Sequence, residues 1–177
     1  IRDSYGCPQG ISERGMGAAV GQVPEMCELN THWVTSVTWL PVIVKLTPNI
    51  TRITDPAHAA LAGGAHALSL INTINSIMKV DLDTLQITPS IGGRGTHGGY
   101  AGPAVKPIAL NMLSELVTDP QVIRSGVPIS GMGGIQTWRD AAEFLLLGAG
   151  SLQVCTAVMH YGYRLIDDLT DGLSPVS

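Results

Sequence analysis

The stretch that most constrains the fold is residues 127–158, where two apolar segments flank a glycine cluster and a helical pattern. Residues 127–130 are typical of a strand, Gly131, Gly133 and Gly134 of a tight turn, and residues 151–154 of a second strand. Strand, turn, helix and strand in this order predict a βαβ unit. Such a unit needs a parallel sheet, so the stretch indicates the α/β class.

The glycine turn is also a candidate ligand site. Glycine adopts positive φ and lets a ligand approach the backbone, whose N–H groups near a helix start bind phosphate without a basic side chain. A β/α barrel holds phosphate at the turns after its last two strands. Here these are the turn at Gly133 and Gly134 and the turn at Cys155 and Thr156. The glycines would serve equally well as tight turns alone, and the local pattern leaves both interpretations open.

Strand and helix alternate along the rest of the chain. We expect the end of a strand at 1–5, strands at 41–46 and 67–71, helices at 24–38, 55–62, 103–117 and 163–172, a glycine-rich loop at 6–21, and a long excursion at 74–102. The first helix has Pro24 in its first turn and apolar residues at Met26, Leu29, Trp33, Val34 and Val37. The count is the end of one strand plus four βα steps. This predicts the carboxyl-terminal half of a TIM-type (β/α)8 barrel over residues 1–177, with an open doubly wound sheet as the alternative.

Composition limits the classes of function. Hydrophobic residues make up 45% and charged residues 14% of 177 residues, so one well-filled domain is expected, with apolar surface left to meet a partner. A net charge of −4 gives no support for binding nucleic acid or an anionic membrane. The cysteines at 7, 27 and 155 form no metal signature, and reduced thiols in a cytoplasm fit them best. No run reaches membrane length and no signal peptide is visible, while the first residue, Ile1, suggests an excised piece.

Several chemically useful side chains come just after predicted strands, on the face that carries ligand sites in barrels and open α/β sheets. Lys45 ends an apolar strand, where it would donate to an electron-rich ring or anion, form a Schiff base, or simply be solvated. Cys7 lies between Gly6 and Pro8, which favours an exposed turn in which a thiol can deliver a proton. Asn72 offers a donor and an acceptor to an amide-like ring, or it stops the strand. Cys27 and Cys155 are expected to be packing residues.

Six ordered blocks of the sequence carry a resemblance to a known family. They are CPQ with ERGMG at 7–17, VKLTPN at 44–49, NTI at 72–74, GGYAGPAVKPIAL at 98–110, GMGGI at 131–135 and LQVCTA at 152–157. The chain resembles the dihydropyrimidine dehydrogenase group of the dihydroorotate dehydrogenase superfamily, and most of all the flavin-barrel subunit of its NAD-dependent type.

The resemblance implies a (β/α)8 barrel that binds FMN and reduces uracil or thymine to the 5,6-dihydro base with electrons from NADH. It implies that Cys7 is the acid in a mobile loop and that Lys45 lies beside the flavin ring. It assigns the pyrimidine to three residues, which are Ser4, Asn72 and Thr73. It assigns FMN to Lys45 and to the phosphate-holding residues Gly102, Gly133, Gly134, Cys155 and Thr156.

The sequence also departs from this family. Ser4-Tyr5-Gly6 stands where the family usually has Asn-x-Ser, which removes a substrate amide partner, and Ala101 replaces a small polar residue. The first three strands of the family barrel are not in the sequence. The iron–sulfur module is not in it either, since three scattered cysteines cannot ligate a four-Cys cluster. We therefore expect NAD and iron–sulfur clusters on other parts or on an electron-supplying partner subunit, a homo-oligomer, and no activity from the fragment alone.

Two other functions remain open on the sequence. One is a phosphate-binding barrel lyase or isomerase that uses Lys45 as a Schiff base. The other is a non-catalytic barrel fragment that acts in assembly through an exposed sheet edge.

Overall fold

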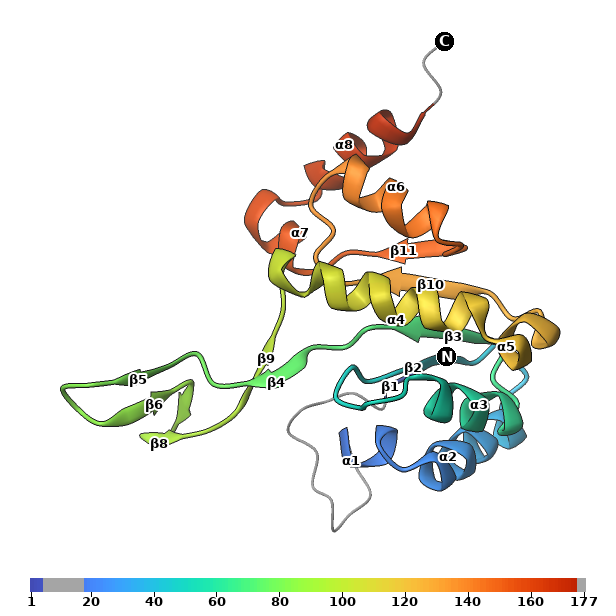
Figure 1. Cartoon of the computed structure of the whole chain (residues 1–177), viewed down its shortest axis with the longest axis horizontal. Coiled ribbons are helices and arrows are strands. Elements are labelled where there is room, and N and C mark those ends of the chain that lie inside the picture. Colours follow the sequence, from blue (N-terminus) through green and yellow to red (C-terminus); the bar gives the residue numbers. More distant parts are fainter. Residues whose placement is uncertain (5–17, 175–177) are drawn as a thin grey trace.

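The sheet at the centre of the molecule is entirely parallel (Figure 1). The structure, a computed structural model, describes residues 1–4 and 18–174. The strands follow the order β1-β2-β3-β10-β11, and each neighbouring pair is parallel. Their bounds are Arg2–Ser4 for β1, Ile43–Lys45 for β2, Ala67–Leu70 for β3, Ile129–Met132 for β10 and Ser151–Gln153 for β11.

This strand order decides between the two predicted architectures. Each new strand of the five-stranded sheet is added at the same edge, in chain order, without a reversal. Because parallel crossovers are right-handed, successive crossovers that proceed in one direction place their helices on one face of the sheet. A doubly wound sheet needs a reversal of strand order, so the described sheet has the winding of a β/α barrel and not the open alternative.

Helices follow the strands at the expected places. Those with predicted counterparts are α2 (Pro24–Val37), α3 (Thr54–Ala62), α4 (Lys106–Thr118), α6 (Trp138–Leu146) and α8 (Arg164–Leu173). The 3-10 turn η2 (Pro103–Val105) forms the start of the helix predicted at 103–117. The short helices α1 (Ala18–Gly21), α5 (Pro120–Ser125) and α7 (Thr156–Tyr161) were not predicted. Too few residues form each of them to show a helical period.

The core lies between the sheet and these helices. Val44 on β2, Leu68 on β3 and Phe144 on α6 are fully buried. Gly131 lies inside β10, so the expectation that it belongs to the turn after the strand is wrong. A Cβ at this position would come within 2.6 Å of the Phe144 ring. Glycine is therefore required here because α6 packs closely on the strand.

The apolar residues of α2 are only partly used in the core: Met26 and Val34 pack against it, whereas Leu29, Trp33 and Val37 are exposed. Cys27 and Thr31 are the buried residues of this helix, whereas Trp33 is 56% and Val37 84% exposed. The reason is the close approach of α3, at whose end a Cβ on Gly63 would lie 2.7 Å from the Thr31 Cβ. Only small side chains fit at such a contact, so the bulkier apolar residues are turned outward.

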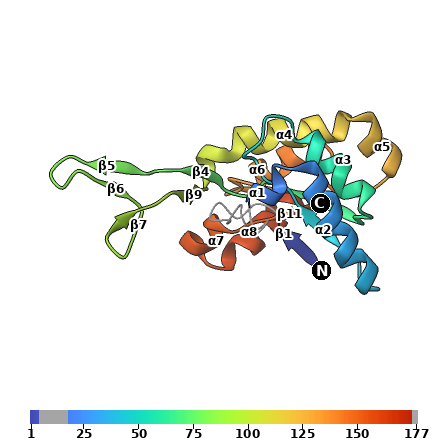
Figure 2. The same ribbon diagram turned by 90° about the horizontal axis from the view of Figure 1, so that it is seen from below.

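The excursion between β3 and α4 is an antiparallel arm that projects from the body of the molecule (Figures 1 and 2). It is built from three two-stranded ladders with bounds Ile74–Ser76 (β4), Lys79–Asp81 (β5), Gln86–Thr88 (β6), Ser90–Ile91 (β7), Arg94–Gly95 (β8) and Gly98–Tyr100 (β9). The pairs are β4 with β9, β5 with β6 and β7 with β8. Leu82 and Leu85 are 83% and 79% exposed at its far turn. Two-stranded ladders are only marginally stable alone, so this part contributes little to the core.

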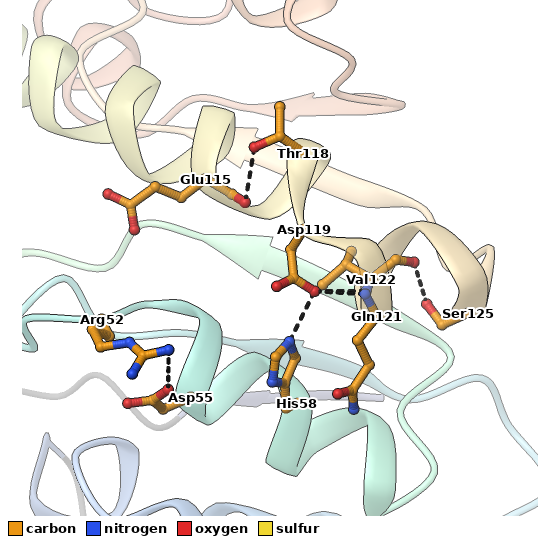
Figure 3. Close-up of polar contacts among 9 residues, drawn as sticks. All are labelled: Arg52, Asp55, His58, Glu115, Thr118, Asp119, Gln121, Val122 and Ser125. Carbon is orange, nitrogen blue, oxygen red and sulfur yellow. Dashed lines mark hydrogen bonds and ion pairs between the residues drawn. The ribbon is translucent and has the colours of Figure 1, made fainter.

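The carboxylate of Asp119 connects two of the helices, α3 and α5 (Figure 3). Asp119 caps α5 by accepting from the N–H groups of Gln121 and Val122, each at 2.9 Å, and its Oδ1 lies 2.8 Å from Nε2 of His58 on α3. Burial raises the pKa of the Asp119 carboxyl, but these hydrogen bonds outweigh it and hold the pKa below its usual value. One side chain therefore caps α5 and ties it to α3.

We expect Asp119→Ala to lower the free energy of unfolding by about 1 kcal/mol, because it removes a helix cap. Denaturant unfolding at neutral pH measures this change. Asp83→Ala, at an exposed turn of the arm, is the matched control and should leave stability unchanged. Equal stability of the Asp119 variant and the control would contradict the assigned role.

Candidate functional site

A cavity of about 450 Å³ opens at the carboxyl ends of β2, β3, β10 and β11. This volume is in the range of small-molecule sites, which run from roughly 300 to 1,000 Å³. Its wall contains the strand-end and turn residues Lys45, Ile71, Asn72, Thr73, Tyr100, Ala101, Gly102, Val105, Met132, Gly133, Gly134, Ile135, Gln136, Gln153, Val154, Cys155, Thr156 and Ala157. The cavity thus brings together eight of the ten predicted site residues.

Three glycines form a crowded cradle in the wall of the cavity. Gly102, Gly133 and Gly134 have φ values of +93°, +130° and +78°, which side chains rarely adopt. A Cβ on Gly134 would lie 2.8 Å from the Lys106 Cβ and 3.0 Å from the Gly102 carbonyl oxygen. A Cβ on Gly102 would lie 3.6 Å from Cγ2 of Thr156. The cradle is therefore built from the turns after the arm, after β10 and after β11, which approach one another closely because these glycines carry no side chain.

Polar side chains also line the cavity. Lys45 is the last residue of β2 and is partly buried. Asn72 follows β3, and its side-chain amide donates to the Ser4 hydroxyl at 3.4 Å, while its Oδ1 accepts from the Thr73 N–H at 2.8 Å. The structure thus brings Ser4 to the cavity through Asn72. Cys7 lies outside the described residues.

Asn49, to which the sequence analysis gave no role, fixes the base of the arm. Its side-chain amide donates to the Thr73 carbonyl at 3.1 Å and to the Thr47 hydroxyl at 3.1 Å, and its Oδ1 accepts from the Asn75 N–H at 2.8 Å. These bonds hold the segment that carries Asn72 and Thr73 in place. The sequence does show that Asn49 is a turn residue whose side chain can both donate and accept hydrogen bonds. Its partners Thr73 and Asn75, however, are about 25 residues away, and sequence spacing does not reveal them.

An ion-pair clamp that the sequence did not reveal lies behind the glycine cradle. Nζ of Lys106, in the first turn of α4, is 2.6 Å from Oδ1 of Asp140 and 2.9 Å from a carboxylate oxygen of Glu143, both on α6. The other Asp140 oxygen accepts from the N–H groups of Gln136 and Thr137, at 3.1 and 2.9 Å. The clamp thus joins the turn after the arm to the turn after β10.

The clamp shifts the pKa values of Asp140 and Lys106 in opposite directions. Burial raises the pKa of the Asp140 carboxyl, but the Lys106 ammonium and the backbone N–H groups outweigh burial and lower this pKa from 3.8 to about 2. Hydrogen bonds to Asp140 and Glu143 raise the pKa of Lys106. Because the folded-state pKa of Asp140 lies below the unfolded value, the ionised carboxylate stabilises the fold above pH 3.8. That contribution falls as the pH drops from 3.8 toward 2.

We expect Asp140→Asn to lower the free energy of unfolding at pH 7 by about 2 kcal/mol, since each pKa unit corresponds to about 1.36 kcal/mol. The difference from the wild type should shrink as the pH falls through 3.8 toward 2. Denaturant unfolding at a series of pH values measures both effects. Asp168→Asn, on the exposed side of α8, is the control. A stability difference that does not depend on pH would argue against the clamp.

Two further residues of the wall correct the sequence analysis. Cys155 is exposed, so the expectation that it packs in the core is wrong, whereas Cys27 is buried as expected. Gln153, the last residue of β11, lines the cavity and was not predicted. In the described part of the chain, no cluster of three or more His, Cys, Asp or Glu side chains is placed to hold a metal ion. Among these same residues, no helix has the length and apolar character needed to cross a bilayer.

Fold and cavity together define a β/α-barrel protein with its ligand site at the carboxyl ends of the strands. The family model described as dihydroorotate dehydrogenase matches residues 7–176, and the chain belongs to this family. It is also similar in fold to the ligand-free DHODH of Eimeria tenella, with a TM-score of 0.69 and 18% sequence identity. That match covers 97% of this chain and 49% of the other chain, so the described sheet is part of a barrel.

The chain is also similar in sequence to curated dihydropyrimidine and dihydroorotate dehydrogenases. The NAD-dependent dihydropyrimidine dehydrogenase subunit PreA of Escherichia coli (strain K12) is 45% identical over 174 residues, which cover 98% of this chain and 42% of the relative. The chloroplastic dihydropyrimidine dehydrogenase (NADP(+)) of Arabidopsis thaliana is 44% identical, with 94% and 39% covered. The catalytic subunit of dihydroorotate dehydrogenase B (NAD(+)) of Pyrococcus abyssi is 39% identical, with 95% and 52% covered. The chain therefore spans about half or less of the length of these relatives.

Proposed function

We propose that the chain is the carboxyl-terminal, FMN- and pyrimidine-binding part of a flavin-dependent oxidoreductase that reduces uracil or thymine to the 5,6-dihydro base with electrons from NADH. The observation that carries this proposal is that one cavity is lined both by the glycine cradle and by Lys45, Asn72 and Thr73. The names of the relatives in Escherichia coli and Arabidopsis thaliana support the substrate class.

The cradle fits the phosphate of FMN. Backbone N–H groups of a glycine turn bind an anion without a basic side chain. Gly133 and Gly134 line the cavity with positive φ, and the absence of a Cβ at each lets the turn pack closely on Ala109 and Lys106. Gly102 and Thr156 complete the cradle, and Cys155 precedes Thr156 on the same turn. We expect all five to hold the phosphate.

The polar part of the wall fits an electron-rich ring system and a pyrimidine. When bound, FMN supplies hydride transfer between its ring and the substrate. The Lys45 ammonium lines the cavity and would stabilise negative charge that develops on the ring. Asn72, held by its bond to Ser4 and followed by Thr73, presents amide donors and acceptors to the pyrimidine. From the sequence, Cys7 is the acid that exchanges a proton with the substrate.

Electron supply and assembly extend this proposal. We expect NAD and iron–sulfur clusters to be bound outside these residues, by other parts of the protein or by an electron-supplying partner subunit. The relative in Escherichia coli is named as a subunit, which supports a partner. We also propose a homo-oligomer, a reducing cytoplasmic location, and no turnover by residues 1–177 alone.

Gly134→Ala should weaken FMN binding about tenfold or more. A side chain at this φ is strained, and its Cβ would press against the Gly102 carbonyl within the cradle. Fluorescence titration of the purified protein with FMN measures the affinity. Gly126→Ala is the matched control, because Gly126 also has positive φ but would meet nothing within 4 Å. Loss of affinity in both variants alike would contradict a role of the cradle.

In the complete enzyme, Cys7→Ala should slow pyrimidine reduction about 10²–10⁴-fold while FMN remains bound, since a positioned acid contributes about that much. Stopped-flow measurement of uracil reduction gives the rate, and flavin absorbance confirms that FMN is still bound. Cys27→Ala is a control that changes a buried thiol on α2, away from the cavity. Turnover of the Cys7 variant within a factor of about two of wild type would rule out the acid. A borohydride-trapped substrate adduct on Lys45 would instead favour a Schiff-base enzyme.

A further inference from the structure

A row of polar residues crosses the sheet in register. The backbone pairing aligns Ser4 on β1 with Lys45 on β2, Lys45 with Ser69 on β3, Ser69 with Ser130 on β10, and Ser130 with Ser151 on β11. Residues paired across parallel strands point to the same face of the sheet. The neighbouring positions Val44, Leu68 and Ile129 are buried on the opposite face, which the helices cover, so this polar row faces the interior of the barrel.

Ser69 stands out in this row. Its side chain is completely buried, and its hydroxyl has no hydrogen-bond partner among the described residues. Buried hydroxyls are nearly always hydrogen-bonded, so an exception calls for a functional explanation. The next residue, Ser130, does have a partner, because its Oγ accepts from Nε2 of Gln153 at 2.9 Å.

The neighbours of Ser69 tie it to the cavity. Lys45 lies on one side of it in the row, and the Ser130–Gln153 pair lies on the other. Both Lys45 and Gln153 line the cavity, whereas Ser69 does not. Adjacent strands are about 4.8 Å apart, which brings the Ser69 hydroxyl within reach of the side chains on both sides. An ammonium has three N–H donors, so Lys45 can donate one to Ser69 and keep its other contacts.

We propose that Ser69 is a positioning residue for Lys45, an inference that rests on the proposed function. With an electron-rich ring in the cavity, the Ser69 hydroxyl accepts an N–H of the Lys45 ammonium and donates its own proton to Ser130. Ser130 is already fixed by Gln153. The result is a continuous hydrogen-bonded row beneath the ligand, from Lys45 on β2 to Gln153 on β11. Ser69 touches no ligand and acts by holding the ammonium where negative charge develops on the ring.

The test is the midpoint potential of FMN in the flavin-loaded protein. Ser69→Ala should weaken the preference for reduced over oxidised FMN about tenfold, which lowers a two-electron potential by about 30 mV. Stability should stay the same or rise, because the variant loses a buried hydroxyl for which residues 1–4 and 18–174 offer no hydrogen-bond partner. A residue that only fills space would leave the potential unchanged. Ser151→Ala, an exposed serine at the far end of the same row, is the matched control and should not shift it.

A double-mutant cycle with Lys45→Met shows whether Ser69 acts through the lysine. In the Lys45→Met background, Ser69→Ala should cause no further shift of the potential. An unchanged potential in Ser69→Ala, or an equal shift with and without Lys45, would overturn the inference while the proposed function stands. A wild-type protein that binds no FMN would overturn the proposed function, and this inference with it.

Discussion

The in-register pairing of five parallel strands is the constraint on which the rest of the structure depends. Because side chains alternate along a strand, this register puts an apolar row against the helices and a polar row on the other face. A slip of one residue would exchange the two rows and bury Lys45 among apolar helices. The same register sets the ends of β2, β3, β10 and β11 side by side, so that turns far apart in the chain line one cavity.

Close backbone contacts then fix the cavity walls. Gly131 lets Phe144 of α6 lie directly on β10, and Gly134 lets the turn after β10 approach the turn that ends the arm. The Lys106–Asp140 pair joins these two turns from behind. Each of these contacts lets two segments come close together. The two glycines do so because they have no Cβ, and the ion pair does so because neither charge is left unpaired.

Much of this arrangement was predictable from the sequence because strand ends and glycine turns carry local signals. The parallel α/β class is confirmed, and Lys45, Asn72, Gly134 and Thr156 were placed at strand ends on spacing alone before the structure brought them to one cavity. What was not predictable depends on partners distant in sequence. The buried face of α2 is set by Gly63 of α3, and the partners of Asn49 and Lys106 lie on other elements. Helical periodicity cannot tell which face a neighbour will approach, and a charge pair 34 residues apart has no sequence signature.

The cap on α6 has a consequence for how salt should act on a bound phosphate. The amides of Gln136 and Thr137, just before this helix, already donate to the Asp140 carboxylate, and the nearby ammonium of Lys106 is engaged by Asp140 and Glu143. A phosphate bound in the cradle as proposed would therefore be met mainly by the uncharged N–H groups of the turn glycines. Attraction between unlike charges is weakened by ions in solution, whereas short hydrogen bonds to neutral amides are affected far less. The cradle is thus suited to retain an anionic cofactor over a wide range of ionic strength.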